Sequence, residues 1–259
     1  MIDAHAHLDD TRFGSDIDAV IERAVAAGVT RIISCGGDLA SSELNVGLAH
    51  RSANVLATVG IHPHRARDWS ADAEKILAAL ARHPRVIAIG EIGMDLSGRS
   101  APRDAQETAF LAQLALARRL DLPVVVHVRD AGAETRALVD RTDPTRGMIH
   151  CYSEGPAEVS TWLERGLFMS FAGIATYPGN GRLREAARLV PRDRLLVETD
   201  APYLQPQSRR GERRNEPAYV IDTLAVIAEA RGEDPGALGE QIAANAAALF
   251  GPRWPAGTA

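Results

Sequence analysis

Eight short apolar runs rich in β-branched residues recur along the chain, and longer segments with helical periodicity separate them. Continuous apolar strands that alternate with helices indicate a parallel sheet buried on both faces. Eight such units favour a closed (β/α)8 barrel over an open doubly wound sheet, and no Gly-x-Gly-x-x-Gly follows the first run. We therefore predict a TIM barrel that forms a single domain over residues 1–259. The expected strands are 1–8, 30–35, 55–61, 86–92, 123–128, 147–151, 167–172 and 194–198.

Apolar positions spaced at i, i+1, i+4 and i+7 in residues 105–120 predict an amphipathic helix. An earlier helix is expected to open at Ser15, where Asp18 three residues later resembles a capping box. Gly28 suits the end of that helix. Two further helical segments close the chain, at 217–231 and 235–250.

The composition is that of an ordinary globular protein, with 46% hydrophobic and 24% charged residues, so a large core can form. No run of 18 apolar residues and no secretory signal are present, so we expect no membrane segment and a cytoplasmic location. Cys35 and Cys151 both end apolar runs and are expected to be buried thiols. A net charge of −5 excludes the basic field of a tight non-specific duplex binder, but not an enzyme that meets nucleic acid briefly.

Histidines and acids stand at the ends of the predicted strands. His5 and His7 are two residues apart, so their side chains point to the same side of a strand. Strand ends converge on one rim of a barrel, where barrel enzymes keep their active sites. Taken singly, each residue has a structural explanation, such as a core histidine or a capping aspartate. Their shared position favours one site, made of His5, His7, Glu91, His127, His150 and Asp200.

Imidazole and carboxylate groups together suit divalent ions such as Zn²⁺, Mn²⁺ or iron. A carboxylate has two oxygens, so Glu91 can bridge two ions about 3.5–4 Å apart. His5, His7 and Asp200 would hold one ion, and His127 and His150 the other. We expect a water activated by both ions to act as the nucleophile, with Asp200 as ligand and proton acceptor. Glu91 and Asp200 are therefore the predicted catalytic residues.

Several longer segments carry a resemblance to a known family. They are Asp-Ala-His-Ala-His-Leu at 3–8, Gly-Ile-His-Pro-His at 60–64, Gly-Glu-Ile-Gly at 90–93, Pro-Val-Val-Val-His at 123–127, Glu-Thr-Asp-Ala-Pro-Tyr-Leu at 198–204 and Arg-Asn-Glu-Pro-Ala-Tyr-Val at 214–220. Over essentially its whole length the chain resembles the TatD family of metal-dependent deoxyribonucleases, within the amidohydrolase superfamily. The resemblance implies a TIM barrel with two divalent ions, such as Mg²⁺, Mn²⁺ or Zn²⁺. It also implies phosphodiester hydrolysis, as a 3′-to-5′ exonuclease that prefers single-stranded DNA or oligonucleotides.

Substrate contacts are expected beside these ligands. Arg129 shares a strand face with His127 and can grip a phosphate with two hydrogen bonds, or else pair with Asp130 or Glu134. The resemblance suggests that His62 and His64 contact a phosphate or the leaving group; the alternative is that one of them ligates a metal transiently or that neither has a role. Core packing is the first expectation for Tyr203 and Tyr152, and stacking on a base is the alternative. The arginine-rich loop 205–215 either attracts a polyanion or is a solvated surface.

The chain departs from the family pattern at three places that touch no ligand. Leu96 stands where the family usually has an aromatic residue, and the segment 96–103 is altered. Glu154 replaces a small residue and adds negative charge where a phosphate would approach. These changes can alter which substrate is accepted.

Two other functions remain open. Many amidohydrolases bridge their metals with a carboxylated lysine, but the only lysine, Lys75, lies in a helical segment away from any strand end. Glutamate-bridged relatives that act on RNA, aminoacyl or other small esters are an alternative. A metal-binding scaffold with vestigial activity is a second alternative, which the intact set of ligands disfavours. The oligomeric state is undetermined, and a monomer is compatible with the sequence.

Overall fold

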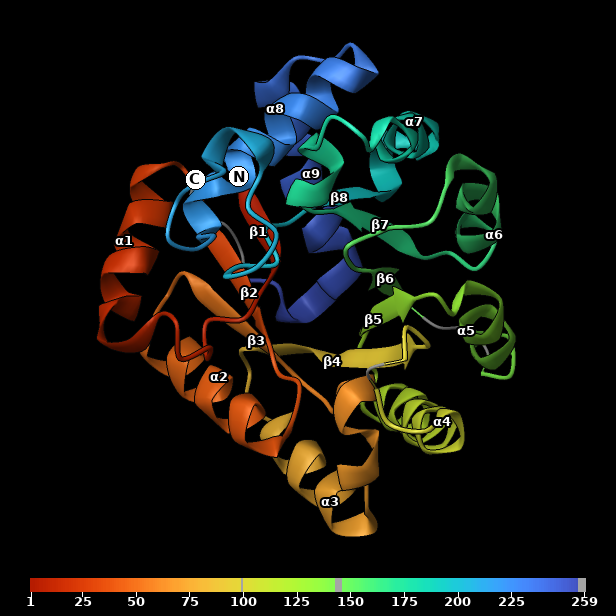
Figure 1. Ribbon diagram of the computed structural model, residues 1–259. Coiled ribbons are helices and arrows are strands. Elements are labelled where there is room, and N and C mark those ends of the chain that lie inside the picture. Colours follow the sequence, from red (N-terminus) through yellow and green to blue (C-terminus); the bar gives the residue numbers. More distant parts are fainter. Residues whose placement is uncertain (99, 143–145, 256–259) are drawn as a thin grey trace.

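The computed structural model describes residues 1–98, 100–142 and 146–255 (Figure 1). Eight parallel strands pair in chain order, which confirms the predicted (β/α)8 barrel. The expected span 1–259 and the altered segment 96–103 both include residues outside this description. The strands are β1 Ile2–Ala6, β2 Arg31–Cys35, β3 Val55–Val59, β4 Val86–Asp95, β5 Val124–Arg129, β6 Gly147–Ile149, β7 Phe168–Phe171 and β8 Leu195–Val197.

The barrel is joined between its first and last strands. A parallel bridge links Ala6 with Ala201, just past β8. The N–H of His7 donates to the carbonyl oxygen of Ala201 at 2.7 Å, and the N–H of Asp200 donates to that of His5 at 2.9 Å. These bonds hold Asp200 next to the end of β1, although almost the whole chain separates the two segments.

Helices surround the strands, and Figure 1 shows α1 to α8 as the outer ring. The predicted helix at 105–120 is present and begins two residues earlier. The expected helix at 217–231 opens with a 3-10 turn, and the one at 235–250 is present as predicted. The helices are α1 Ile17–Ala26, α2 Leu39–Arg51, α3 Ala71–Leu80, α4 Arg103–Leu120, α5 Gly132–Val139, α6 Val159–Leu163, α7 Gly181–Leu189, α8 Val220–Arg231 and α9 Pro235–Phe250.

The predicted start of the first helix is wrong. Residues 14–16 form a 3-10 turn, α1 begins at Ile17, and no side chain caps it. Buried Phe13 and the ion pair of Asp16 with Arg214, at 2.6 Å, decide this geometry instead of a local cap. The end at Gly28 is as expected, since this glycine has φ +87° just after the helix.

Helix α9 closes the end of the barrel where the strands begin, and Figure 1 shows it behind the ring of strands. The side-chain amide of buried Asn245 donates to the carbonyl oxygens of Arg192 and Leu195, both at 2.8 Å. Arg253, just past α9, donates to the carbonyl oxygens of Ala81 and Val86. The opposite rim is thereby left as the accessible end of the barrel.

Strand β4 extends three residues beyond its predicted end, because Met94 and Asp95 continue the pairing with β5. Cys35 is buried as expected, whereas Cys151 is only partly buried; both thiols are free. Within the described ranges, none of the helices combines the length and apolar character that a membrane span requires.

Gly93 in β4 is required by close packing. Its φ is +140°, and a Cβ added there would lie 2.1 Å from the carbonyl oxygen of His127. Gly93→Ala is expected to lower the free energy of unfolding by about 2–5 kcal/mol, because backbone strain and overpacking add. Gly47→Ala, on the open face of α2, serves as the control. This substitution is expected to raise the free energy of unfolding by up to about 1 kcal/mol. Urea titrations measure both, and a Gly93→Ala variant as stable as the parent contradicts the prediction.

Candidate metal centre

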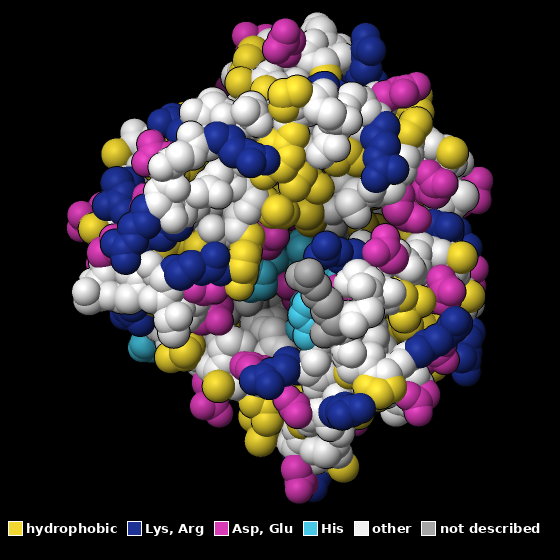
Figure 2. All heavy atoms as spheres, viewed as in Figure 1, with side chains coloured by type: hydrophobic (Ala, Val, Ile, Leu, Met, Phe, Trp, Pro, Cys, Tyr) yellow, Lys and Arg dark blue, Asp and Glu magenta, His cyan; other side chains and the backbone are white. Residues whose placement is uncertain are grey.

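The six candidate ligands gather at the rim where the strands end. Figure 2 shows histidine side chains inside a hollow at the centre of this face, with arginine and acidic side chains around it. His5 and Glu91 are almost completely buried, so their interactions take place away from bulk water. The carrying elements are β1 for His5, the residues just after β1 for His7, β4 for Glu91, β5 for His127, and the residues just after β6 and β8 for His150 and Asp200.

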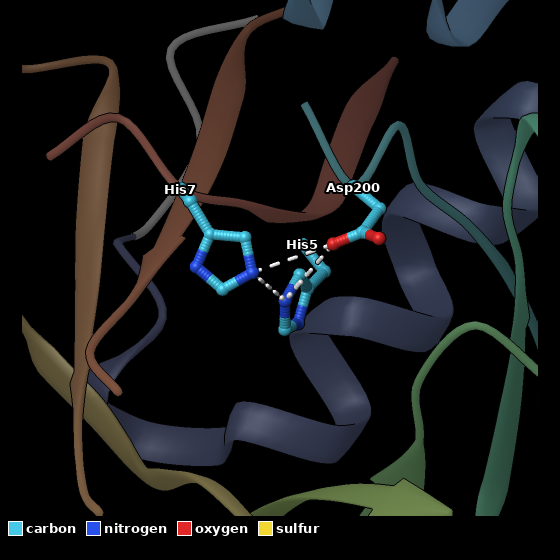
Figure 3. Close-up of side chains that lie close together, drawn as sticks. All are labelled: His5, His7 and Asp200. Atoms are coloured by element: carbon cyan, nitrogen blue, oxygen red, sulfur yellow. Dashed lines mark hydrogen bonds and ion pairs between the residues drawn. The ribbon is translucent and has the colours of Figure 1, made fainter. Parts of the chain in front are cut away.

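The first group of ligand atoms has spacings that suit one ion (Figure 3). The Nε2 atoms of His5 and His7 lie 3.2 Å apart. Oε2 of Glu91 lies 3.4 and 3.5 Å from them, and Oδ1 of Asp200 lies 3.6 and 3.4 Å from them. A tetrahedral ion with ligand distances of about 2.0–2.2 Å separates its ligand atoms by about 3.3–3.6 Å. The residues present therefore fit a divalent metal.

The other oxygen of Glu91 faces a second group of imidazoles. Oε1 lies 2.8 Å from Nδ1 of His127, 2.8 Å from Nε2 of His150 and 3.2 Å from Nε2 of His62. His127 and His150 approach each other to 3.1 Å. Most of these are hydrogen-bond separations, so an ion here requires the ligand atoms to move apart by about 0.5 Å. His62, expected as a substrate contact, thus lies among the candidate ligands.

Charges within this cluster balance one another. Burial lowers the pKa of His5. Burial also opposes the charge of His7, but its hydrogen bond with Asp200 and the charge of Glu91 raise its pKa to about 9. Burial opposes ionisation of Glu91, yet the charges of the imidazoles, led by His150, hold its pKa well below the usual range. Ionised carboxylates are thus paired with protonated imidazoles, where a metal cation would provide the same positive charge.

Two acidic residues that the sequence pattern did not single out form hydrogen bonds beside the candidate ligands. Oε1 of Glu198 lies 3.2 Å from Nδ1 of His150 and accepts the N–H of Cys151 at 2.8 Å. Asp3 accepts the N–H and the hydroxyl of Thr199. Partners of this kind orient metal-binding side chains. Each acid stands two residues before a candidate ligand, and this spacing was the available signal.

A third such acid, Asp95, joins the second group to His64. Its Oδ2 lies 2.9 Å from Nε2 of His64 and 3.4 Å from Nε2 of His127. Ser97 donates its N–H and hydroxyl to the other oxygen. The structure therefore pairs His64, expected to contact substrate, with an internal acid. The spacing of four residues from Glu91 along one strand could have identified Asp95.

A cavity of about 340 Å³ adjoins the candidate ligands. Its wall includes His127, His150 and Asp200 together with Arg129 and Tyr203. The structure thus brings two of the expected substrate contacts next to the ligands. A volume of this size lies at the small end of the range for ligand pockets.

Arg129 is exposed, and no described residue forms an ion pair with it. Glu134, one of the two partners considered for it, lies instead 3.5 Å from Arg103. The salt-bridge alternative for Arg129 is therefore absent from the described part of the chain, and its guanidinium is available to an anion.

The two tyrosines considered for base stacking differ in exposure. Tyr203 is 44% exposed, and its hydroxyl donates to Asp10 at 3.0 Å. Arg12 covers its ring at 4.0 Å from the centroid. Tyr152 is buried and its hydroxyl donates to the carbonyl oxygen of Gly155, so the stacking role considered for Tyr152 is wrong.

The arginines of the loop 205–215 are partly used within the fold. Arg209 pairs with Asp222 at 2.6 Å, and the largely buried Arg214 pairs with Asp16. Arg210 stacks on the ring of Tyr177. These contacts reduce the positive charge that the loop offers to a polyanion.

Glu154 does not add free negative charge at the rim, contrary to expectation. Its carboxylate lies 3.2 Å from Nη1 of Arg136 and accepts the indole N–H of Trp162. Arg136 of α5 balances the charge of this carboxylate, and Trp162 of α6 adds a hydrogen bond. Leu96, the other departure from the family pattern, packs against the hydrophobic core.

Comparisons with known proteins agree with this site. A family model described as "TatD related DNase" matches residues 2–251. Two relatives named "3'-5' ssDNA/RNA exonuclease TatD", from Citrobacter rodentium and Citrobacter koseri, are 41% and 39% identical over 257 residues. The matches cover 97% of this chain and 98% and 99% of those proteins.

Solved structures give the same result. A TatD homologue from Escherichia coli K12 has a TM-score of 0.88 and 30% identity, covering 96% of this chain and 97% of the other. A TatD family hydrolase from Entamoeba histolytica has a TM-score of 0.87 and covers 97% and 98% of the two chains. At 22% identity this second likeness concerns the fold.

Metal affinity is expected to depend on pH. Since the pKa of His7 is raised to about 9, its imidazole is protonated below that pH and must lose this proton before Nε2 can bind a cation. We expect affinity for Mn²⁺ to rise between pH 6 and 8, by about tenfold per pH unit for each proton displaced. Calorimetry in buffers of different ionisation enthalpy counts the protons released, and His7→Asn should release one fewer. An affinity that does not change over this range contradicts the assignment.

Proposed function

Because the chain belongs to the family of TatD-related DNases, we propose that it is a metal-dependent phosphodiesterase that removes nucleotides from the 3′ end of single-stranded DNA. The observation that carries this proposal is the carboxylate of Glu91, whose two oxygens face two different imidazole groups. This arrangement is what a pair of metal ions needs from a bridging ligand. The relatives are named for RNA as well as DNA, so single-stranded RNA is a second candidate substrate.

The candidate ligands would have two roles, binding the metal ions and accepting a proton. His5, His7 and Asp200 would hold one ion with Glu91, and His127 and His150 the other. Bound divalent ions supply positive charge to the phosphoryl oxygens and lower the pKa of water. Burial opposes ionisation of Asp200, but its hydrogen bond with His7 lowers its pKa, so its carboxylate is ionised and available to a cation. An ionised carboxylate at this place would also be the proton acceptor.

Arg129 and Tyr203 would position the substrate. The guanidinium of Arg129 lies in the cavity wall without an internal partner among the described residues, so it can donate two hydrogen bonds to one phosphate. The ring of Tyr203 lies 5.9 Å from that of His7; Arg12 covers one of its faces, so the other face would be the stacking surface beside the candidate ligands. His62 and His64 would act mainly through Glu91 and Asp95, the acids they contact.

The size of the cavity favours a chain end as substrate. A volume of about 340 Å³ admits a terminal nucleotide, whereas a duplex is far wider. This supports a preference for single strands over duplex DNA.

The rival functions find less support. Lys75 is exposed on α3 and pairs with Asp72 at 2.9 Å, so a bridge by a carboxylated lysine is disfavoured. A metal-binding scaffold with vestigial activity would need the candidate ligands, but not the cavity beside them with the exposed Arg129 in its wall.

The first test uses single-stranded oligonucleotides labelled at the 5′ end. With Mn²⁺ or Mg²⁺ the protein should shorten them stepwise from the 3′ end, and EDTA should stop the reaction. Glu91→Gln and Asp200→Asn are each expected to lower kcat by at least about 100-fold, since each removes a ligand charge and Asp200 also a proton acceptor. Glu43→Gln, at an exposed position of α2, is the control. Cleavage that persists in Glu91→Gln, or that proceeds from the 5′ end, rejects the proposal.

The second test concerns phosphate recognition by Arg129. Arg129→Gln is expected to raise KM for an oligonucleotide by about 10- to 100-fold, the value of a charge-assisted pair of hydrogen bonds, with a smaller effect on kcat. Arg129→Lys keeps the charge and should restore only part of the affinity. Arg119→Gln, an exposed arginine of α4 that pairs with Glu74, provides the control. An unchanged KM in Arg129→Gln would remove Arg129 from the substrate site.

A further inference from the structure

Asp200 occupies a backbone conformation that needs support from its surroundings. Its φ is +55°, and that of Leu204 is +54°. Residues with a Cβ rarely adopt this left-handed region, although aspartate tolerates it better than most. Such conformations persist where neighbouring groups hold them. The direction in which the Asp200 carboxylate points therefore depends on what fixes the residues on either side of it.

Asn215 fixes both sides of Asp200. Its side chain is completely buried, and its Nδ2 donates to the carbonyl oxygen of Thr199 at 2.8 Å and to that of Tyr203 at 2.6 Å. Its backbone N–H donates to the carbonyl oxygen of Pro202 at 3.2 Å. One residue thus bridges the start and the end of the turn that carries Asp200.

Asn215 is itself held by charged neighbours. Arg214 donates to the carbonyl oxygen of Arg12 and to Asp16, at 2.8 and 2.6 Å. Glu216 accepts two hydrogen bonds from Arg23 at 2.8 and 2.9 Å. These contacts attach the segment 214–216 to α1 and to the loop before it, so they fix the position of Asn215.

We propose that Asn215 is a positioning residue that keeps the carboxylate of Asp200 beside His5 and His7. The inference rests on the proposed role of Asp200 in holding a metal ion and accepting a proton. Without the two donations from Asn215, Asp200 keeps its backbone bond to His5, but the carbonyl groups of Thr199 and Tyr203 lose their common donor and the turn can relax out of the left-handed conformation. The carboxylate oxygen then leaves its place 3.4 Å from His7 and 3.6 Å from His5.

A merely structural role for Asn215 is the alternative, and the chain offers a matched control. Asn245 is also buried, and its Nδ2 also donates to two carbonyl oxygens, those of Arg192 and Leu195, both at 2.8 Å. These lie at the opposite end of β8 from Asp200. Truncating either asparagine removes the same pair of side-chain donations, but only Asn215 adjoins the candidate metal ligand.

The experiment compares Asn215→Ala, Asn245→Ala and Asp200→Asn. Three properties are measured for each variant. Calorimetry gives the affinity for Mn²⁺, and cleavage of a single-stranded oligonucleotide gives kcat and KM. Hydrogen exchange reports on the backbone amides of Asp200 and Tyr203. For Asn215→Ala we expect Mn²⁺ affinity and kcat each to fall by about 10- to 100-fold, with KM changed by less than about threefold and faster exchange at both amides. For Asn245→Ala we expect metal affinity and kcat within about twofold of the parent, despite lower resistance to urea.

Equal effects of the two asparagine variants on metal affinity, or no effect of either, overturn the inference. If Asn215→Ala does not fold, Asn215→Ser replaces it, since serine keeps a hydroxyl donor. The positioning role is then tested by the same comparison, with Asn245→Ser as the control. Asp200→Asn separates the positioning role of Asn215 from the proposed function of the site. Loss of Mn²⁺ binding in Asp200→Asn without loss in Asn215→Ala refutes only the positioning role, whereas parental behaviour of Asp200→Asn refutes the proposed function as well.

Discussion

A carboxylate with almost no exposed surface, that of Glu91, lies at the centre of the barrel rim, and the groups around it must balance its charge. One oxygen faces His5 and His7, and the other faces His127 and His150. A buried charge that loses its partners costs several kcal/mol, so the imidazoles are kept close to this one group. Any cation that binds here replaces protons that already perform the same electrostatic task.

The barrel makes this arrangement possible by bringing backbones very close to one another. Gly90 and Gly93 flank Glu91 at places where a Cβ would collide with Val125 or with the backbone of His127. Helix α9 closes the far end, and the bridge from Ala6 to Ala201 joins the first strand to the last. The polar cluster is therefore built on rigid elements, which is what a site with fixed ligand positions requires.

Much of the candidate site followed from spacing along single strands. His5 and His7 are two positions apart, and this alone predicted that both would face one side. The expected strand ends at residues 92 and 128 likewise placed Glu91 and His127 on the rim. Asp95 escaped prediction because the apolar run ends at residue 92, while the strand pairing continues past it. A hydrophobic pattern marks where a strand is buried by apolar side chains, so the only sequence signal for Asp95 was its spacing of four residues from Glu91.

By itself the sequence determined the alternation of strands and helices, the barrel and the rim on which six candidate ligands meet, because periodicity and strand order are properties of neighbouring residues. Only the tertiary structure decided which oxygen of Glu91 faces which histidines. It also turned Glu154 towards Arg136 and paired Asp16, just before α1, with Arg214. These outcomes depend on contacts between residues far apart in the chain, and a local pattern holds no information about the partner that a charged side chain will meet.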